Sequence, residues 1–424
     1  MSFDLISFFT DPVLRAPTLG SIFMCISSSL VGVLVFLRKR SLLGEALSHT
    51  SYPGVALAVS TFAAFFSPSS DGFVFAILFF AFLSSVLGLL CIDFLKKRFR
   101  VYDDAALTFV LSSFFGIGVL LASRLQTTHA VWYKQVQTFL YGQAATMRDV
   151  HIFIYLALFI FILLAVLILY KNIQMLIFDQ NYMRSLGVQV RYTEMLFVFL
   201  TCLAVVVGIR SVGVVMMAGM LIAPALTARC IAKSLKQMFL FAALFGGVSG
   251  FLGNYLSVSV PELFPGTRFV LPTGPMILII ASVLCFAFLI FSPPNGLLWK
   301  KLSRKKIKSK ILLDETLKFI YSRPGKLASI FQIKEELSIS FLRAYFILWI
   351  LFTKRFLMLK NGSCCLTKRG SKKAIDIFKC HRLWGLYLID FENDCRYSSL
   401  YDLTPELLKD LQEFEHVKYN HGEK

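Results

Sequence analysis

The chain has 424 residues, of which 57% are apolar and only 16% are charged. This composition excludes an ordinary soluble protein, because soluble chains carry more charge and lack repeated uncharged stretches of about 20 residues, the length that crosses a bilayer. The nine cysteines form no C-x-x-C pair, so nothing indicates a zinc ribbon or a disulfide framework. The net charge of +19 fits basic cytoplasmic loops, and the alternative is nucleic-acid contact by part of the chain.

The first 17 residues have no basic start and no small-residue cleavage site, so the first apolar stretch is expected to remain as a span. The apolar stretches predict an all-α polytopic membrane protein with nine spans, at about 17–37, 46–66, 73–92, 105–122, 151–170, 194–209, 212–228, 237–257 and 274–291. With nine spans, every basic cluster lies on one side of the membrane. The positive-inside rule then predicts an outside N-terminus and a cytoplasmic C-terminus.

The second predicted span opens with two ionisable residues, Glu45 and His49, one helical turn apart on the same face. Ionisable groups inside a span are costly and therefore need a reason. A carboxylate and an imidazole in this arrangement can bind Mn(II), Fe(II) or Zn(II). The alternative is a carboxylate at a helix entry beside a hydrogen-bonded histidine.

Several motifs, in order over about 12–295, resemble the manganese/zinc/iron permease family of ABC importers. They are S-L-L-G-E-A-L-S-H at 41–49 with P-G-V-A-L at 53–57, D-D-A-A at 103–106, F-D at 178–179 with S-L-G at 185–187, and G-V-V-M-M-A-G-M-L-I-A-P-A-L-T-A-R at 213–229. The resemblance implies that Glu45 and His49 contribute to a metal site on the transport path. It also implies that the loop from Asp179 to Gly187 contains a cytoplasmic coupling helix that docks on an ATPase subunit. Without the family, this loop would be interpreted as a solvated linker.

The rest of a transporter is expected in other chains. No G-x-x-x-x-G-K-[ST] motif occurs, so ATP hydrolysis is assigned to a separate subunit and this chain is not expected to be an enzyme. The resemblance implies an ABC ATPase subunit, an extracytoplasmic metal-binding protein and a permease dimer partner, at the inner membrane of a bacterium. A Glu/His pair cannot choose between Mn, Fe and Zn, because selectivity depends on geometry and availability.

The composition changes abruptly after residue 299. Residues 1–299 are predicted to form the permease, and 300–310 a basic juxtamembrane linker whose seven Lys and Arg residues favour membrane lipid. Residues 311–424 alternate like a soluble domain. Cleavage between about Pro293 and Leu312 is predicted to release this domain as a cytoplasmic fragment, and the alternative is a permanent juxtamembrane anchor.

The last part of the chain predicts an α+β winged-helix domain. The expected elements are a helix at 311–321, a helix–turn–helix at 327–352, a hairpin at 356–367 with Asn-Gly at its turn, and a helix that Thr367 caps. Helix–turn–helix followed by a hairpin is the winged-helix order. The alternative is a generic α+β interaction domain.

Residues 311–421 resemble the DtxR/MntR family of metal-dependent repressors. The resemblance rests on L-T-K-R-G at 366–370, H-R-L-W-G-L-Y-L at 381–388 and E-F-E-H-V at 413–417. Together, the two halves resemble the permease–repressor fusions of chlamydiae. The resemblance implies a corepressor metal bound by His381, Glu415 and His416, with Gln412 at a further ligand position.

A repressor-like domain also implies DNA as a partner. The candidate contacts are Ser338, Ser340, Arg343, Lys354, Arg355 and Lys360. The expected recognition helix at 341–351 is very apolar, whereas helices that read the major groove usually expose several polar side chains. The main hypothesis is a metal permease fused to this domain. The alternative is a membrane-tethered regulator without transport, which failure to co-purify an ATPase subunit would favour.

Overall fold

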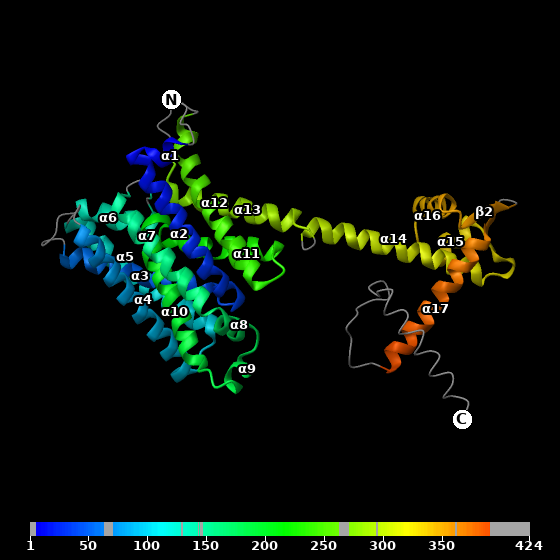
Figure 1. Ribbon diagram of the computed structural model, residues 1–424, viewed down its shortest axis with the longest axis horizontal. Helices are drawn as coiled ribbons and strands as arrows, with labels where there is room; N and C mark the ends of the chain where they lie inside the picture. The colour runs from blue at the N-terminus through cyan, green and yellow to red at the C-terminus, as the bar shows by residue number, and fades with distance from the viewer. Residues whose placement is uncertain are drawn as a thin grey trace. The chain divides into compact units, whose positions relative to one another are not determined.

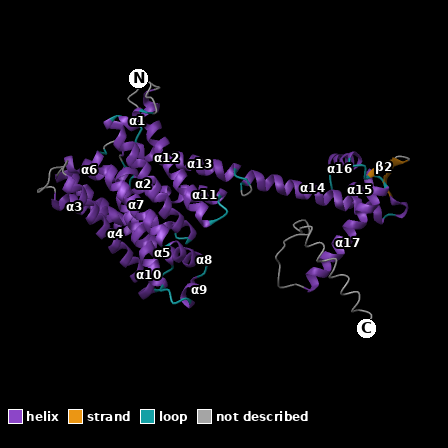
Figure 2. Ribbon diagram, in the orientation of Figure 1, coloured by secondary structure: helices purple, strands orange, loops and turns teal. Residues whose placement is uncertain are grey.

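The computed structural model describes residues 6–62, 71–128, 130–142, 144, 147–262, 271–293, 296–360 and 363–390. The chain divides into two compact units, unit 1 over Met1–Leu297 and unit 2 over Leu298–Lys424. The described part of each unit consists mainly of helices, and the three strands found there all lie in unit 2 (Figure 1, Figure 2).

All the elements of regular secondary structure described in unit 1 are helices, joined by short loops. Its helices are α1 (Ser7–Thr10), α2 (Pro12–Leu37), α3 (Ser41–Phe62), α4 (Asp71–Phe99), α5 (Asp103–Thr128), α6 (Ala130–Tyr141), α7 (Asp149–Ile168), α8 (Tyr170–Phe178), α9 (Gln180–Ser185), α10 (Val190–Val212), α11 (Val214–Ile231), α12 (Leu235–Glu262) and α13 (Thr273–Phe291). Helix α6 lies between the predicted spans 105–122 and 151–170.

Capping residues and glycines set several helix boundaries in unit 1. Asp11 caps α2, because its side chain accepts a hydrogen bond from the Val13 N–H at 2.9 Å and Pro12 occupies the first turn. Gly213 separates α10 from α11 with a φ of 97°. A Cβ at that position would lie 2.5 Å from the backbone of Tyr141, so the break between the two helices requires glycine.

Eight described helices are long and apolar enough to cross a membrane, namely α2, α4, α5, α7, α10, α11, α12 and α13. These candidate membrane helices coincide with eight of the nine predicted spans, and the all-α polytopic fold agrees with the prediction. The remaining predicted span, 46–66, corresponds to α3, whose 22 residues rise by roughly 33 Å. Helix α3 is too polar to pass the same test, and it packs against α4, α5, α11 and α10.

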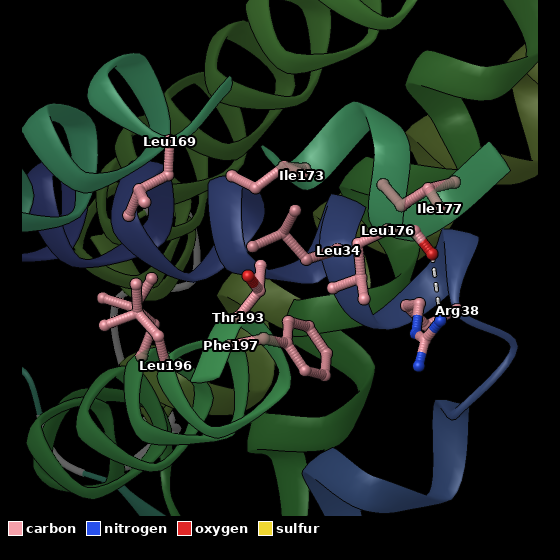
Figure 3. Close-up of a pocket in the computed structure, with 10 residues that line it drawn as sticks. Leu34, Arg38, Leu169, Ile173, Leu176, Ile177, Thr193, Leu196 and Phe197 are labelled. Carbon is pink, nitrogen blue, oxygen red and sulfur yellow. Dashed lines mark hydrogen bonds between the residues drawn. The ribbon is translucent and has the colours of Figure 1, made fainter. Parts of the chain in front are cut away.

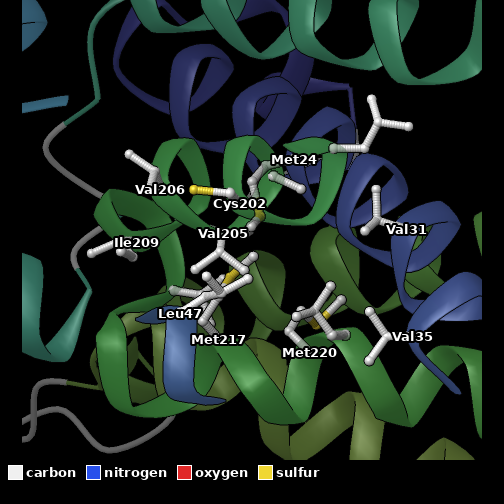
Figure 4. Packing of buried hydrophobic residues seen from close by; sticks show 14 of the residues in the cluster. Met24, Val31, Val35, Leu47, Cys202, Val205, Val206, Ile209, Met217 and Met220 are labelled. Atoms are coloured by element: carbon white, nitrogen blue, oxygen red, sulfur yellow. The ribbon is translucent and has the colours of Figure 1, made fainter. Parts of the chain in front are cut away.

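Helix α2 lies at the centre of unit 1, where it packs against α12, α7, α11 and α10 (Figure 1). The approach to α11 is close, because a Cβ at Gly32 would lie 1.9 Å from the carbonyl oxygen of Leu221. Four sulfur-containing side chains from α2, α10 and α11 are at most 1% exposed and belong to one apolar core: Met24, Cys202, Met217 and Met220 (Figure 4). Flexible thioethers fill irregular space in such a core.

Unit 2 combines helices with a small antiparallel sheet. Its elements are α14 (Leu297–Ser322), η2 (Pro324–Lys326), β1 (Leu327–Ala328), α15 (Ile330–Glu336), α16 (Phe341–Thr353), β2 (Leu357–Lys360), β3 (Ser363–Leu366) and α17 (Lys368–Asp390). The strand order is β1-β3-β2, with Leu357 opposite Leu366. An apolar core joins the elements and includes Leu317, Ile320, Ile333, Ile347, Leu348, Leu351, Leu357, Leu366 and Ile377.

Local signals explain where the helices of unit 2 begin. Ser329 and Gln332 form a capping box, so α15 starts at Ile330 rather than at 327, where the chain pairs with β3. Thr367 caps α17 as predicted, because its Oγ1 accepts from the Gly370 N–H at 3.0 Å. The turn of the predicted hairpin, 361–362, lies outside the described residues.

The basic segment at 300–310 is helical. It forms one continuous helix, α14, with the helix predicted at 311–321. No Gly or Pro occurs between Leu297 and Ser322, and Lys, Arg and Leu are good helix formers. All residues from 300 to 310 except Ser309 are exposed, so the helix displays its seven basic side chains.

Candidate metal path and coupling surface

Helix α3 carries the two candidate transport ligands. Glu45 and His49 are both half-buried, one turn apart, while Ala46 and Leu47 between them are fully buried. The i, i+4 spacing puts the carboxylate and the imidazole on one side of the helix. The structure thus keeps the pair at a partly enclosed position rather than on an outer surface.

The imidazole of His49 has an unusual environment. Its Nδ1 atom is buried and has no hydrogen-bond partner. The ring meets Phe115 of α5 edge-on, with centroids 4.7 Å apart and planes at 83°. A buried nitrogen without a partner costs about 1–3 kcal/mol, so this atom is an available acceptor for a cation. The alternative is a hydrogen-bonded structural histidine, but His49 makes no such bond through Nδ1.

Helix α3 is fixed to α4 by hydrogen bonds to its backbone. Ser84 Oγ donates to the carbonyl oxygen of Thr50 at 2.6 Å, and Ser85 Oγ donates to that of Leu47 at 3.1 Å. A Cβ at Gly54 would lie 2.2 Å from the carbonyl oxygen of Phe80, so the two backbones nearly touch. These contacts hold the segment that carries His49 in one position.

Two protein ligands are the most that the described residues supply here. In that part of the chain, no group of three or more His, Cys, Asp or Glu side chains could hold a metal ion. Glu45 and His49 alone would therefore leave the coordination shell of a bound ion incomplete. A pair of this kind would bind a cation weakly.

The predicted coupling region forms two short helices, α8 and α9. Asp179 caps α9 by accepting from the Tyr182 N–H at 2.9 Å, and Gly187 ends the region with a φ of 75°. Met183 is fully buried and anchors α9. Three large apolar or aromatic side chains at intervals of four are more than half exposed: Phe178, Tyr182 and Leu186. Isolated apolar surface residues are ordinary, but three large ones exposed within nine residues would suit an interaction surface.

Arg38 connects this region to α2. Its Nη1 donates to the carbonyl oxygen of Leu176 in α8 at 3.1 Å, and its Nη2 is paired with Glu194 of α10. The amide oxygen of Gln180, in its favourable orientation, also accepts from Arg38. A small apolar pocket lies beside it, lined by Leu34, Ile173 and Phe197 among others (Figure 3). Sequence reasoning missed this role, because an Arg at the end of a span is interpreted only as a marker of topology.

In unit 2, only one of the three predicted regulatory ligands can be placed. His381 lies on α17, near Asp314 and Glu315 of α14. Burial and then the charge of Lys318 lower the pKa of His381, and the two carboxylates oppose that change. A lowered pKa favours the neutral imidazole that binds metal. Glu415, His416 and the neighbouring Gln412 lie outside the described residues.

The candidate DNA contacts are spread along unit 2. Ser338 and Ser340 precede α16, Arg343 lies in its first turn, and Lys354 and Arg355 follow its end, about 20 Å further along the helix. Lys360 is the last residue of β2. Except for Lys360, whose side chain is not described, all are exposed. The exposed face of α16 between the two ends is apolar.

Comparisons with known proteins show similarity to membrane proteins of metal transport systems. The model of the ABC 3 transport family matches residues 10–292. A "Probable metal transport system membrane protein" of Chlamydia trachomatis is 32% identical over 408 residues, covering 90% of this chain and 87% of that protein. The manganese transport system membrane protein MntC of Bacillus subtilis is 29% identical, covering 87% and 82%. The zinc transport system membrane protein TroC of Treponema pallidum is 31% identical, covering 72% and 97%.

A solved structure is also similar to this chain over a length that corresponds to unit 1. PsaBC from Streptococcus pneumoniae, in complex with Fab, contains a chain that is 25% identical, with a TM-score of 0.59, over 70% of this chain and 98% of that one. Unit 1 makes up 297 of the 424 residues, so the alignment with the chlamydial relative over 90% of the chain must extend into unit 2.

Proposed function

The chain belongs to the ABC 3 transport family as a non-catalytic membrane permease subunit, and from this membership we propose that it imports Mn(II) or Zn(II). The relatives from Bacillus subtilis and Treponema pallidum are named for manganese and zinc transport. Fe(II) is a third ion that a carboxylate and an imidazole accept. The observation that carries the proposal is the buried Nδ1 of His49, which has no hydrogen-bond partner, one turn from Glu45.

The chemistry of the pair suits transient passage. A divalent cation that leaves water loses hydration, which the negative charge of Glu45 and the nitrogen of His49 partly replace. Two ligands hold the ion less tightly than a complete shell, so it can leave when the path opens to the other side. The hydrogen bonds from α4 keep the pair in place during this exchange.

The energy for transport would come from a partner. We assign ATP hydrolysis to an ABC ATPase subunit that docks on Phe178, Tyr182 and Leu186 around α9, and metal delivery to an extracytoplasmic binding protein. A second permease copy would complete the transporter. Movement of α9 would pass through Arg38, which links α8 and α9 to α2 and α10.

Metal uptake by the complete transporter in vesicles tests this proposal. Radioactive Mn(II), Zn(II) and Fe(II) are each offered in turn, with the other two ions unlabelled as competitors, and with or without ATP on the side of the membrane that the ATPase faces. ATP-dependent uptake that one of these ions abolishes at the lowest concentration identifies the substrate. Absence of ATP-dependent uptake of all three ions, in vesicles that contain every subunit, contradicts the proposal.

A second role is proposed for unit 2, as a metal-responsive regulatory domain of winged-helix type. The order α15, α16, β2, β3 supports it, as does the alignment of the chlamydial relative into this unit. Regulatory metal would bind His381 with Glu415 and His416, and DNA would contact Arg343, Lys354, Lys360 and their neighbours. Binding of labelled promoter DNA that depends on added metal, and is lost in His381→Ala, tests this role. DNA binding that is equally strong with and without added metal contradicts this role.

Release of unit 2 by proteolysis belongs to the same proposal. Because α14 is a continuous helix from Leu297, cleavage is favoured before it, in the segment that follows α13, rather than within 300–312. Immunoblotting of native cells with an antibody to 370–390 tests release. A full-length species alone, under both metal-rich and metal-poor growth, contradicts it.

A further inference from the structure

Helix α16 has two apolar faces, and the described residues of unit 2 cover one of them. Ala344, Ile347, Leu348 and Leu351 are buried in the core of unit 2. The opposite face exposes Leu342 (82%), Tyr345 (61%), Phe346 (57%) and Trp349 (55%). Their spacing of i, i+3, i+4 and i+7 makes one continuous stripe.

The stripe continues onto α15. Phe331 is 69% exposed, and its ring centroid lies 6.0 Å from that of Phe341, which precedes the stripe. Within the stripe, the rings of Phe346 and Trp349 are stacked with centroids 6.0 Å apart. A contiguous aromatic patch of this kind is unusual on a soluble surface and marks an interaction site.

The patch has a basic border. Arg343 in α16 and Lys354, the residue after its last turn, are both exposed and lie on one side of the stripe by helical geometry, and Arg355 follows directly. A helix with Trp, Phe and Leu on one face and Arg or Lys beside it is the pattern of a segment that lies in a membrane interface. Trp and Tyr are enriched at that depth.

A bilayer is also within reach of unit 2. Its first helix, α14, begins six residues after the last membrane helix, α13, ends at Phe291. Helix α14 displays seven basic side chains, which attract an anionic leaflet. Each basic residue near the surface raises the ratio of membrane-bound to free protein by about fivefold. The covalent connection thus keeps unit 2 near a lipid surface of complementary charge.

We infer that the exposed face of α15 and α16 docks on the anionic cytoplasmic leaflet, with Leu342, Phe346 and Trp349 at the acyl boundary and Arg343 and Lys354 on lipid phosphates. This inference goes beyond metal transport and does not depend on it. A second copy of unit 2 fits the patch less well, since two basic borders would repel each other. The stripe itself offers no charged group for base readout, so the DNA contacts proposed above for Arg343 and Lys354 require this face to have left the bilayer.

The test uses the full chain in vesicles of phosphatidylglycerol and phosphatidylcholine in equal parts. The emission of Trp349 is obtained as the difference between the wild type and Trp349→Phe, which removes the contribution of the other tryptophans. Brominated phospholipid is expected to quench this component strongly, and quenching is expected to fall in phosphatidylcholine alone. Arg343→Gln should lower the docked-to-free ratio by about fivefold.

Three results would overturn the inference. Emission that aqueous iodide quenches equally in both lipids means that the face stays in water. Emission that neither quencher reaches means that a second copy or another protein covers it. Quenching by bromine that appears only when DNA is added means that the face does not dock on lipid by itself.

Photo-crosslinking gives an independent measurement in case a substitution of Trp349 perturbs unit 2. Benzoylphenylalanine is introduced in place of Leu342, with Asp376, an exposed position on α17, as the matched control. A phospholipid adduct at position 342 that exceeds the adduct at 376 supports docking. Equal adducts at both positions, or a protein adduct at 342, contradict it.

Discussion

Helices α3 and α16 invert the usual relation between polarity and environment. In unit 1, α3 is too polar to qualify as a span, yet Ser48, Thr50 and Ser51 are fully buried. In unit 2, α16 is strongly apolar, yet Leu342 and Trp349 are mostly exposed. The polarity of a helix therefore does not by itself show whether other parts of the protein cover it. Protein surrounds α3, whereas one face of α16 has no neighbour among the described residues.

The hydrogen bonds within α3 show which of its polar groups are structural. Ser48, Thr50 and Ser51 each donate to a carbonyl oxygen three residues earlier, at 2.8, 3.1 and 2.5 Å. Their polarity is satisfied inside the helix, as polar side chains inside a membrane protein require. His49 differs, because its Nδ1 has no such bond. The difference separates side chains that serve the fold from the one that is available to a cation.

The largest expected effect is on transport. His49→Ala and Glu45→Ala should each reduce metal uptake by about 100-fold or more, because even indirect supports of metal ligands cost 10–100-fold. Uptake of radioactive metal by the reconstituted transporter measures the loss, with the amount of inserted chain determined in parallel.

Ser60→Ala is the matched control for this loss, since Ser60 is exposed near the end of the same helix. It should transport normally. Normal uptake by the double variant of Glu45 and His49 would remove both residues from the metal path.

The next effect tests whether α3 is as tightly enclosed as its contacts indicate. Gly54→Ala should destabilise the protein by about 1–3 kcal/mol, because the new Cβ would lie 2.2 Å from the backbone of Phe80. Gly116→Ala, on α5, is the control, since a Cβ there meets nothing within 4 Å. It should leave stability unchanged or raise it slightly. Thermal unfolding in detergent compares the two, and equal midpoints would show that α3 and α4 are not in close contact.

A smaller effect is expected where the chain enters α3. Arg38→Ala should lower the metal transported per ATP hydrolysed by about tenfold, because it removes the links to Leu176 and Glu194, which together are worth about 1.5 kcal/mol. Arg38→Lys should restore little, since the guanidinium fork makes both contacts. Arg40 lies 4.0 Å from Glu194, so Arg40→Ala should change the ratio much less. Equal effects of the two alanine variants would show that only charge matters here.

The sequence predicts well what depends on local composition. Uncharged stretches located eight membrane helices, and the Glu45/His49 spacing put both groups on one face. It could not predict contacts made between distant segments, such as Arg38 with Leu176, because nothing in a basic cluster distinguishes a topological charge from a structural one. Nor could it show that 300–310 and 311–321 form one helix, because the change in composition at the junction looks like a boundary.

The smallest expected effect is on the reactivity of two cysteines in β3, one of which lies in the apolar core that also buries one face of α16. Adjacent cysteines on β3 point to opposite faces of the sheet, so Cys364 is buried in the core and Cys365 is partly exposed. Burial also raises the pKa of the Cys364 thiol, which keeps it protonated, and unreactive, to a higher pH than an ordinary cysteine. Alkylation at pH 8, followed by peptide mass spectrometry, should therefore modify Cys365 well before Cys364. Raising the pH should accelerate Cys364 only at the alkaline end of the range. Denaturant should remove the difference, because it exposes both thiols. Equal rates in the folded protein would mean that Cys364 does not lie in the apolar core that buries Ile347, Leu348 and Leu351 of α16, which the docking inference requires for the covered face of that helix.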